Sequence, residues 1–117
     1  MKYTIYHNPR CRKSREALQL LKERQLEVEV VKYLEQPFNK NSLGAVLQKI
    51  KMEPAALIRK NEQIWKKEFA SQNYDPNQLI EIMVAHPQLI ERPIVTAHNS
   101  GVLARPLEQL INFLVSS

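Results

Sequence analysis

Polar and apolar residues alternate near the start of the chain, from Lys2 to His7, and again from Glu27 to Tyr33. Alternation with a period of two places every second side chain on one face. Both segments are also rich in the β-branched and aromatic residues that favour strands. Asn8-Pro9 interrupts the first segment, because proline fixes its own φ angle and restricts the residue before it. We therefore expect a strand in each segment.

Four further segments show the spacing of amphipathic helices. Residues three or four positions apart share one face of a helix. The four sets are Ala17, Leu18 and Leu21; Leu43, Val46, Leu47 and Ile50; Leu79, Ile82, Met83 and His86; and Leu107, Leu110, Ile111 and Leu114. Asp75-Pro76 favours a helix start, since aspartate caps helices and proline suits the first helical position. Shorter helical pieces are expected between Pro54 and Phe69.

The residues towards the C-terminus predict a hairpin. Pro93–Ala97 and Val102–Ala104 flank Asn99-Ser100-Gly101, where glycine is available for a positive φ angle in the turn. The order of elements is then β-α-β, a helical middle and β-β-α, and right-handed crossover makes the first two strands parallel and adjacent. We expect an α/β protein with a thioredoxin-like mixed four-stranded sheet. It would be a single domain over residues 1–117, with a helical insertion at about 39–88 between its halves.

The composition of this 117-residue chain fits one globular domain, with 44% hydrophobic and 25% charged residues. No apolar run approaches the roughly 20 residues that span a bilayer, and the N-terminal residues do not read as a signal peptide. One cysteine excludes an intramolecular disulfide and agrees with a reducing compartment. We therefore expect a cytoplasmic protein without membrane contact. Its net charge of +5 permits an anionic partner but does not select one.

Cys11 is the candidate for chemistry, because it follows the first expected strand and stands at or just before the first helix. Free backbone N–H groups and the positive end of the helix dipole favour a thiolate at such a position. Four cations lie within four residues of it, namely Arg10, Arg12, Lys13 and Arg15. Such surroundings lower a cysteine pKa from about 8.5 to roughly 3.5–7.5, and the thiolate is the nucleophilic form. The alternative is an inert, buried cysteine.

Two neighbours of Cys11 are candidates for supporting roles. Ser14 stands where a C-x-x-C oxidoreductase has its second cysteine, and its hydroxyl can donate to the thiolate or simply cap the helix. His7 can supply a donor or a positive charge, or can be structural. The chain lacks the spacing of a zinc site and of a glycine-rich phosphate loop. It also lacks a C-x5-R phosphatase loop, which requires arginine where Ala17 stands.

Three later arginines have unusual neighbours. Arg59 lies beside an apolar run, and Arg92 and Arg105 each precede a proline at opposite ends of the hairpin. An arginine fork binds tetrahedral oxyanions through two parallel hydrogen bonds, so three converging forks would hold an arsenate- or phosphate-like anion. The proline that leads into the third strand of a thioredoxin-like fold is commonly cis and lies beside the active-site loop, which would bring Arg92 next to Cys11. The alternative is that each arginine is solvated or ion-paired at the surface.

The segments YHNPRCRKSR, LIRK, HPQLIERPIV and LARP, in this order and spacing, resemble the ArsC family of glutaredoxin-linked arsenate reductases. The resemblance runs from Tyr3 to about Leu114. It implies roles for six residues. These are Cys11 as the nucleophile, His7 and Ser14 as support for its thiolate, and Arg59, Arg92 and Arg105 as the oxyanion-binding arginines.

The resemblance also implies a mechanism and its partners. Cys11 attacks arsenate, glutathione attacks the adduct, and glutaredoxin resolves the mixed disulfide with release of arsenite. Glutathione is then a co-substrate, and we expect no bound cofactor, no metal and no nucleic acid partner. We also expect a monomer. The single thiol suits this external-thiol route and not an intramolecular cysteine relay.

Two other functions stay open. Cys11 is followed by Arg12-Lys13, which is more basic than in the best-known reductases. One alternative is therefore an ArsC-like, glutathione-dependent thiol reductase of another substrate. The other is a regulator that binds RNA polymerase, as the related Spx-type proteins do. Those proteins typically use C-x-x-C as a redox switch, and Ser14 removes the second thiol.

Overall fold

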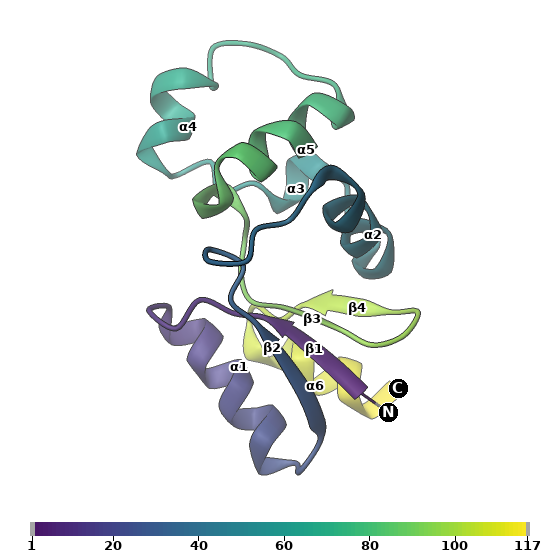
Figure 1. Ribbon diagram of the computed structural model, residues 1–117. Helices are drawn as coiled ribbons and strands as arrows, with labels where there is room; N and C mark the ends of the chain where they lie inside the picture. The colour runs from purple at the N-terminus through teal and green to yellow at the C-terminus, as the bar shows by residue number, and fades with distance from the viewer. Residues whose placement is uncertain (1, 117) are drawn as a thin grey trace.

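A computed structural model describes residues 2–116, which form a four-stranded sheet with helices on both faces (Figure 1). The strands are β1 (Lys2–Tyr6), β2 (Glu27–Val31), β3 (Ile94–Thr96) and β4 (Gly101–Leu103). The helices are α1 (Arg12–Glu23), α2 (Lys40–Ile50), α3 (Pro54–Leu57), α4 (Gln63–Glu68), α5 (Pro76–Ala85), the 3-10 helix η1 (Pro87–Leu89) and α6 (Leu107–Ser116). Residues 1 and 117, which bound the expected domain, lie outside the described residues. No helix among residues 2–116 is long and apolar enough to cross a membrane.

The sheet has the strand order β2-β1-β3-β4, with β1 parallel to β2 and antiparallel β1–β3 and β3–β4 pairs. This confirms the expected mixed α/β sheet, including the parallel first pair. The strands are shorter than the alternation indicates, so His7 and Tyr33 lie in the loops that follow β1 and β2. The His7 N–H still bonds to the Val31 carbonyl at 2.8 Å. Beyond it, the turn at Pro9 takes the chain away from its partner strand.

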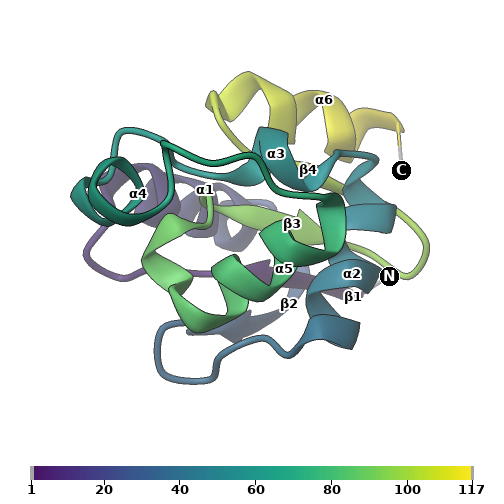
Figure 2. The ribbon, with the colours of Figure 1, turned by 90° about the horizontal axis from the view of Figure 1, so that it is seen from above.

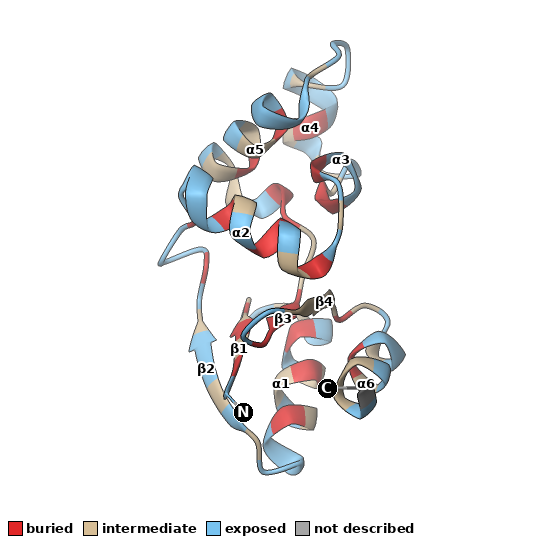
Figure 3. Ribbon diagram, turned by 90° about the vertical axis from the view of Figure 1, so that its right-hand side faces the viewer, coloured by how far each residue is buried: buried red, intermediate tan, exposed pale blue. Residues whose placement is uncertain are grey.

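Alternate residues of the central strands face two separate hydrophobic clusters. Ile5 and Val95 are buried with Leu21 of α1 and residues of α6. Ile94, one position before Val95, packs instead with the cluster formed by α2 to α5, which includes Met83. Figure 2 shows α2, α3 and α5 lying over the sheet, and Figure 3 shows buried residues in the sheet and in helices on both sides of it. The sheet thus joins two helical layers.

Gly101 does not adopt the positive φ angle expected of it, since neither glycine has one. It opens β4 opposite Thr96, and a Cβ at this position would lie 2.9 Å from Thr96 Cγ2 and 3.1 Å from the Val95 carbonyl oxygen. Glycine is therefore required by the close approach of the two strands and not by backbone freedom. Gly44 differs, because it lies within α2 and a Cβ there would have no atom within 4 Å apart from its chain neighbours and the backbone of its own helix.

Replacement of the two glycines by alanine should change the free energy of unfolding in opposite directions. Gly44→Ala removes a glycine from a helix interior where there is room, so it should stabilise the protein by about 0.5–1 kcal/mol. Gly101→Ala forces packed atoms apart and should destabilise it by roughly 1–3 kcal/mol. Urea denaturation of both variants measures the changes. Shifts of the same sign would contradict this account of the glycines.

Candidate active site

Cys11 is the N-cap residue of α1, with backbone angles of φ −94° and ψ 121°. The loop that carries it leaves β1 and folds back through a 3.0 Å hydrogen bond from the Cys11 N–H to the Asn8 carbonyl. No side chain caps this helix start, although Asn39 caps α2 and Asp75, as expected, caps α5. The first N–H groups of α1 are therefore available to the half-buried Cys11 sulfur.

The pKa of the Cys11 thiol lies below its ordinary value. Burial by itself raises this pKa, but the backbone N–H groups of Ser14 and Lys13 and the guanidinium of Arg92 together outweigh it. Each of these groups favours the charged form, either through a hydrogen bond or through its positive charge. The direction agrees with the thiolate expected at a helix start.

Contrary to expectation, the positive charge that lowers the Cys11 pKa does not come from the four cations adjacent to it in sequence. The cations beside Cys11 in sequence are exposed to solvent, where water screens their charge. Arg12 pairs with Glu16 at 3.2 Å on the surface of α1, and Arg15 donates to the Pro9 carbonyl at 3.0 Å. The arginine that lowers the Cys11 pKa comes instead from a distant part of the chain.

Ser14 and His7 form a buried pair behind the Cys11 loop. Ser14 Oγ lies 2.6 Å from His7 Nδ1 and accepts a 3.1 Å hydrogen bond from the Asn8 N–H. Burial, together with nearby lysine and arginine charges, lowers the pKa of His7. The lowered pKa favours the neutral form of His7 at neutral pH and argues against the positive charge considered for it. The group of Ser14 that lowers the Cys11 pKa is its backbone N–H and not its hydroxyl.

Arg92 lies beside Cys11, as the position of Pro93 predicts. The Arg92–Pro93 peptide bond is cis, and β3 begins directly after it. Because β3 is antiparallel to β1 in the centre of the sheet, the residues before β3 face the loop after β1. Sheet topology therefore brings the guanidinium to the thiol.

The other two expected arginines have protein partners. Arg105 Nη1 donates a 3.2 Å hydrogen bond to the carbonyl of Arg92. This bond holds the backbone of Arg92, the arginine that lies beside the thiol. Arg59 forms ion pairs with Glu62 at 3.3 Å and Glu91 at 3.2 Å. The structure thus brings one arginine directly to the thiol, a second to the backbone of the first, and a third into a carboxylate network.

Tyr33 also belongs to these surroundings and is missing from the site residues expected from the sequence. Burial raises its pKa to about 12; the charges of Arg92 and Arg59 lower this pKa and that of Cys11 raises it. The phenol therefore lies within electrostatic reach of all three groups. The sequence does contain a signal that could have placed Tyr33 near Cys11, because Tyr33 follows β2, the strand parallel to β1. The carboxyl ends of neighbouring parallel strands meet at one edge of a sheet.

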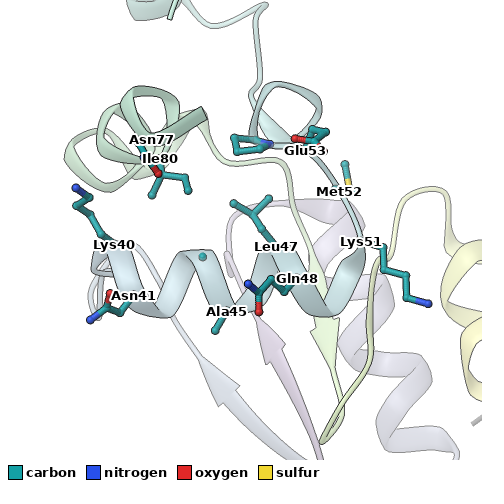
Figure 4. A pocket seen from close by; sticks show the side chains of 12 residues that line it. Lys40, Asn41, Ala45, Leu47, Gln48, Lys51, Met52, Glu53, Asn77 and Ile80 are labelled. Carbon is teal, nitrogen blue, oxygen red and sulfur yellow. The ribbon is translucent and has the colours of Figure 1, made fainter. Parts of the chain in front are cut away.

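A surface hollow of about 790 Å³ lies apart from these residues, between α2, α3 and α5 (Figure 4). Its lining includes Lys40, Leu47 and Met52 and none of the residues around Cys11. Within residues 2–116 there is also no group of three His, Cys, Asp or Glu side chains that could hold a metal ion. The candidate chemistry therefore centres on the Cys11 loop.

Comparison with known proteins agrees with this architecture, since residues 6–113 match the ArsC family. The chain belongs to the ArsC family. It is 44% identical over 112 residues to YfgD of Escherichia coli K12, an uncharacterised protein, with 94% of each chain covered. It is 40% identical over 108 residues to an arsenate reductase of Neisseria meningitidis serogroup B, covering 91% of this chain and 92% of that one. The solved structure of an arsenate reductase from Vibrio cholerae superposes with a TM-score of 0.90 and 36% identity, covering 96% of this chain and 97% of that one.

In this ArsC family protein, Arg92→Ala should raise the pKa of the Cys11 thiol, because the change removes a positive charge and a donor that favour the thiolate. Alkylation by iodoacetamide below neutral pH should slow roughly tenfold, since only the thiolate reacts. Arg12→Ala is the matched control, because Arg12 is exposed and paired with Glu16. Its alkylation rate should stay within about twofold of the wild type. Equal losses in the two variants would contradict the role given to Arg92.

His7 should make the protein less stable as the pH falls below 6.5, the ordinary histidine pKa, because burial lowers that pKa in the folded state. The unfolded chain then binds a proton at His7 in a range where the folded protein does not, so the free energy of unfolding decreases as the pH falls. His7→Asn keeps a polar partner for Ser14 but cannot titrate, and it should lose this part of the dependence. Urea denaturation between about pH 5 and 8 measures the difference. A variant with the wild-type dependence would refute a neutral, buried His7.

Proposed function

We propose that this protein reduces arsenate to arsenite, with Cys11 as the nucleophile and with glutathione and glutaredoxin as external thiols. The observation that carries the proposal is the position of Cys11 at an uncapped helix start beside Arg92, which lowers the pKa of its thiol. The arsenate reductases among its relatives support the choice of arsenate as substrate. Glutathione and glutaredoxin as the reducing partners are part of the proposal and do not come from these relatives.

The first step is the attack of the Cys11 thiolate on arsenic. A sulfur–arsenic bond forms, and one arsenate oxygen takes up protons and leaves as water. Arg92 neutralises charge on the remaining oxygens, and the N–H groups at the start of α1 stabilise the thiolate before attack. His7 and Ser14 hold the loop in place through their mutual contact and the bond to Asn8.

The electrons for reduction come from outside the chain, which has one cysteine. A glutathione thiol attacks Cys11 Sγ and forms a sulfur–sulfur bond. The electron pair of the sulfur–arsenic bond stays on arsenic, which passes from the pentavalent to the trivalent state and leaves as arsenite. Glutaredoxin then takes the glutathione from the mixed disulfide and restores the thiol. This route needs no bound cofactor and suits a monomer in the cytoplasm, where glutathione is kept reduced.

The three arginines contribute in different ways in this proposal. Arg92 binds the oxyanion directly, and Arg105 positions it through the Arg92 carbonyl. Arg59 is held by Glu62 and Glu91 in the free protein. A substrate oxyanion that replaces one of these carboxylates would receive the same fork-shaped pair of hydrogen bonds.

A coupled assay with arsenate, glutathione and glutaredoxin tests the proposal. Cys11→Ser should abolish arsenite formation, and Arg92→Ala should lower kcat/KM about a hundredfold, as expected for loss of a donor that stabilises developing charge. Arg105→Ala should cost roughly tenfold, because it acts through another residue, and Arg12→Ala is the control with nearly full activity.

Three outcomes would redirect the interpretation. Full activity in Arg92→Ala would remove the arginine from the reaction while leaving the nucleophile. Reduction of disulfides without reduction of arsenate would indicate a thiol reductase of another substrate. Capture of RNA polymerase by the wild type and by Cys11→Ser alike would indicate a regulator.

A further inference from the structure

Among the described residues, two buried side-chain N or O atoms have no hydrogen-bond partner: Tyr33 Oη and Arg92 Nε. Both belong to the surroundings of Cys11, because the Arg92 guanidinium interacts with the thiol and also lies near the phenol. An unpaired buried donor costs free energy, and proteins keep few of them. Two such donors beside one activated thiol indicate a site that a ligand completes.

The Tyr33 ring is held in place while its hydroxyl stays unpaired. Tyr33 lies in the turn after β2, where the N–H groups of Glu35 and Gln36 bond to the Lys32 carbonyl at 2.9 and 2.8 Å. Its ring packs against Phe38 with 6.2 Å between the centroids. The side chain is 1% exposed, so bulk water does not satisfy the hydroxyl. Packing therefore fixes the position of the hydroxyl without using its donor.

We propose that Tyr33 is a substrate-binding residue whose Oη donates a hydrogen bond to an oxygen of the anion held between Cys11 and Arg92. The inference rests on the proposed arsenate chemistry and adds a residue to it. Arginine supplies donors only, and a phenol fixed beside it extends the same donor set. Such a set fits a tetrahedral oxyanion, which presents acceptors to every neighbour.

The protonation state of Tyr33 supports this role. Its pKa of about 12 keeps the phenol neutral near neutral pH, while the lowered pKa of Cys11 favours the thiolate. A neutral hydroxyl adds a donor without adding negative charge to an anion site. The Arg92 guanidinium is near enough to the hydroxyl to lower the Tyr33 pKa, but arginine has donors only and cannot accept the hydroxyl proton. The hydroxyl proton is thus free for a ligand.

Tyr33→Phe separates substrate binding from a structural role. The variant keeps the ring and its packing, and it removes a buried hydroxyl whose proton has no acceptor in the protein, so Tm should stay the same or rise slightly. Oxyanion binding should weaken about tenfold, which corresponds to the loss of one hydrogen bond to a charged group. The two effects have opposite signs, whereas a structural hydroxyl would lower both stability and binding.

Protection of Cys11 from iodoacetamide by inorganic phosphate measures binding without requiring reduction. The phosphate concentration for half-protection should rise about tenfold in Tyr33→Phe, and KM for arsenate should rise in step. The alkylation rate without phosphate should stay unchanged. Tyr6→Phe is the matched control, because Tyr6 packs on the same Phe38 ring at 5.0 Å but its hydroxyl interacts with Thr96. It should be protected like the wild type.

Each outcome decides the inference. Equal protection of the wild type and Tyr33→Phe would overturn the role of Tyr33 and leave the arsenate proposal standing. A wild-type protein that phosphate does not protect, or a clear loss of Tm in Tyr33→Phe, would also overturn it. Protection that depends on the Tyr33 hydroxyl in a protein that fails to reduce arsenate would support the oxyanion role and refute the proposed substrate.

Discussion

The interaction between Cys11 and Arg92 is the one on which the rest of the site depends. Burial alone would keep the thiol protonated, because a low-dielectric environment disfavours the charged form. The N–H groups of an uncapped helix start and one guanidinium reverse that tendency. A capping side chain at the start of α1 would occupy those N–H groups, so the absence of such a cap is itself part of the site.

The sheet explains why these groups meet. β1 and β3 are antiparallel neighbours in the centre, so the end of β1 and the start of β3 lie at the same edge (Figure 1). β2 is parallel to β1 and ends at that edge too, which brings Tyr33 to it. The thiol, the guanidinium and the phenol are thus carried by three loops that follow or precede neighbouring strands. Two hydrophobic layers hold those strands in register.

Much of the fold could be predicted, because strands and helices leave local periodic signals. The alternation around Ile5 and the spacing of Leu43 and Leu47 locate elements that the structure contains. Gly101 shows the limit of such reasoning. A glycine beside an expected turn indicates backbone freedom. The structure shows a different requirement, because a Cβ at this position would lie only 2.9 Å from Thr96 Cγ2 once β3 and β4 have paired. The ends of the strands could not be predicted from the sequence for a similar reason, since a strand ends where its partner strand turns away.

In the candidate site, too, some features depend on residues adjacent in sequence and others on residues brought together by folding. The residues next to Cys11 are enough to place its thiol at a helix start, because they form that helix and its first N–H groups. Which of the 17 lysines and arginines lowers the pKa of that thiol depends on how the chain folds. The same holds for the neutral state of His7 and the presence of Tyr33. Desolvation and Coulomb interactions depend on distance in space. Water screens the exposed cations beside Cys11, whereas the half-buried Arg92 before β3 lies against the thiol and is screened less.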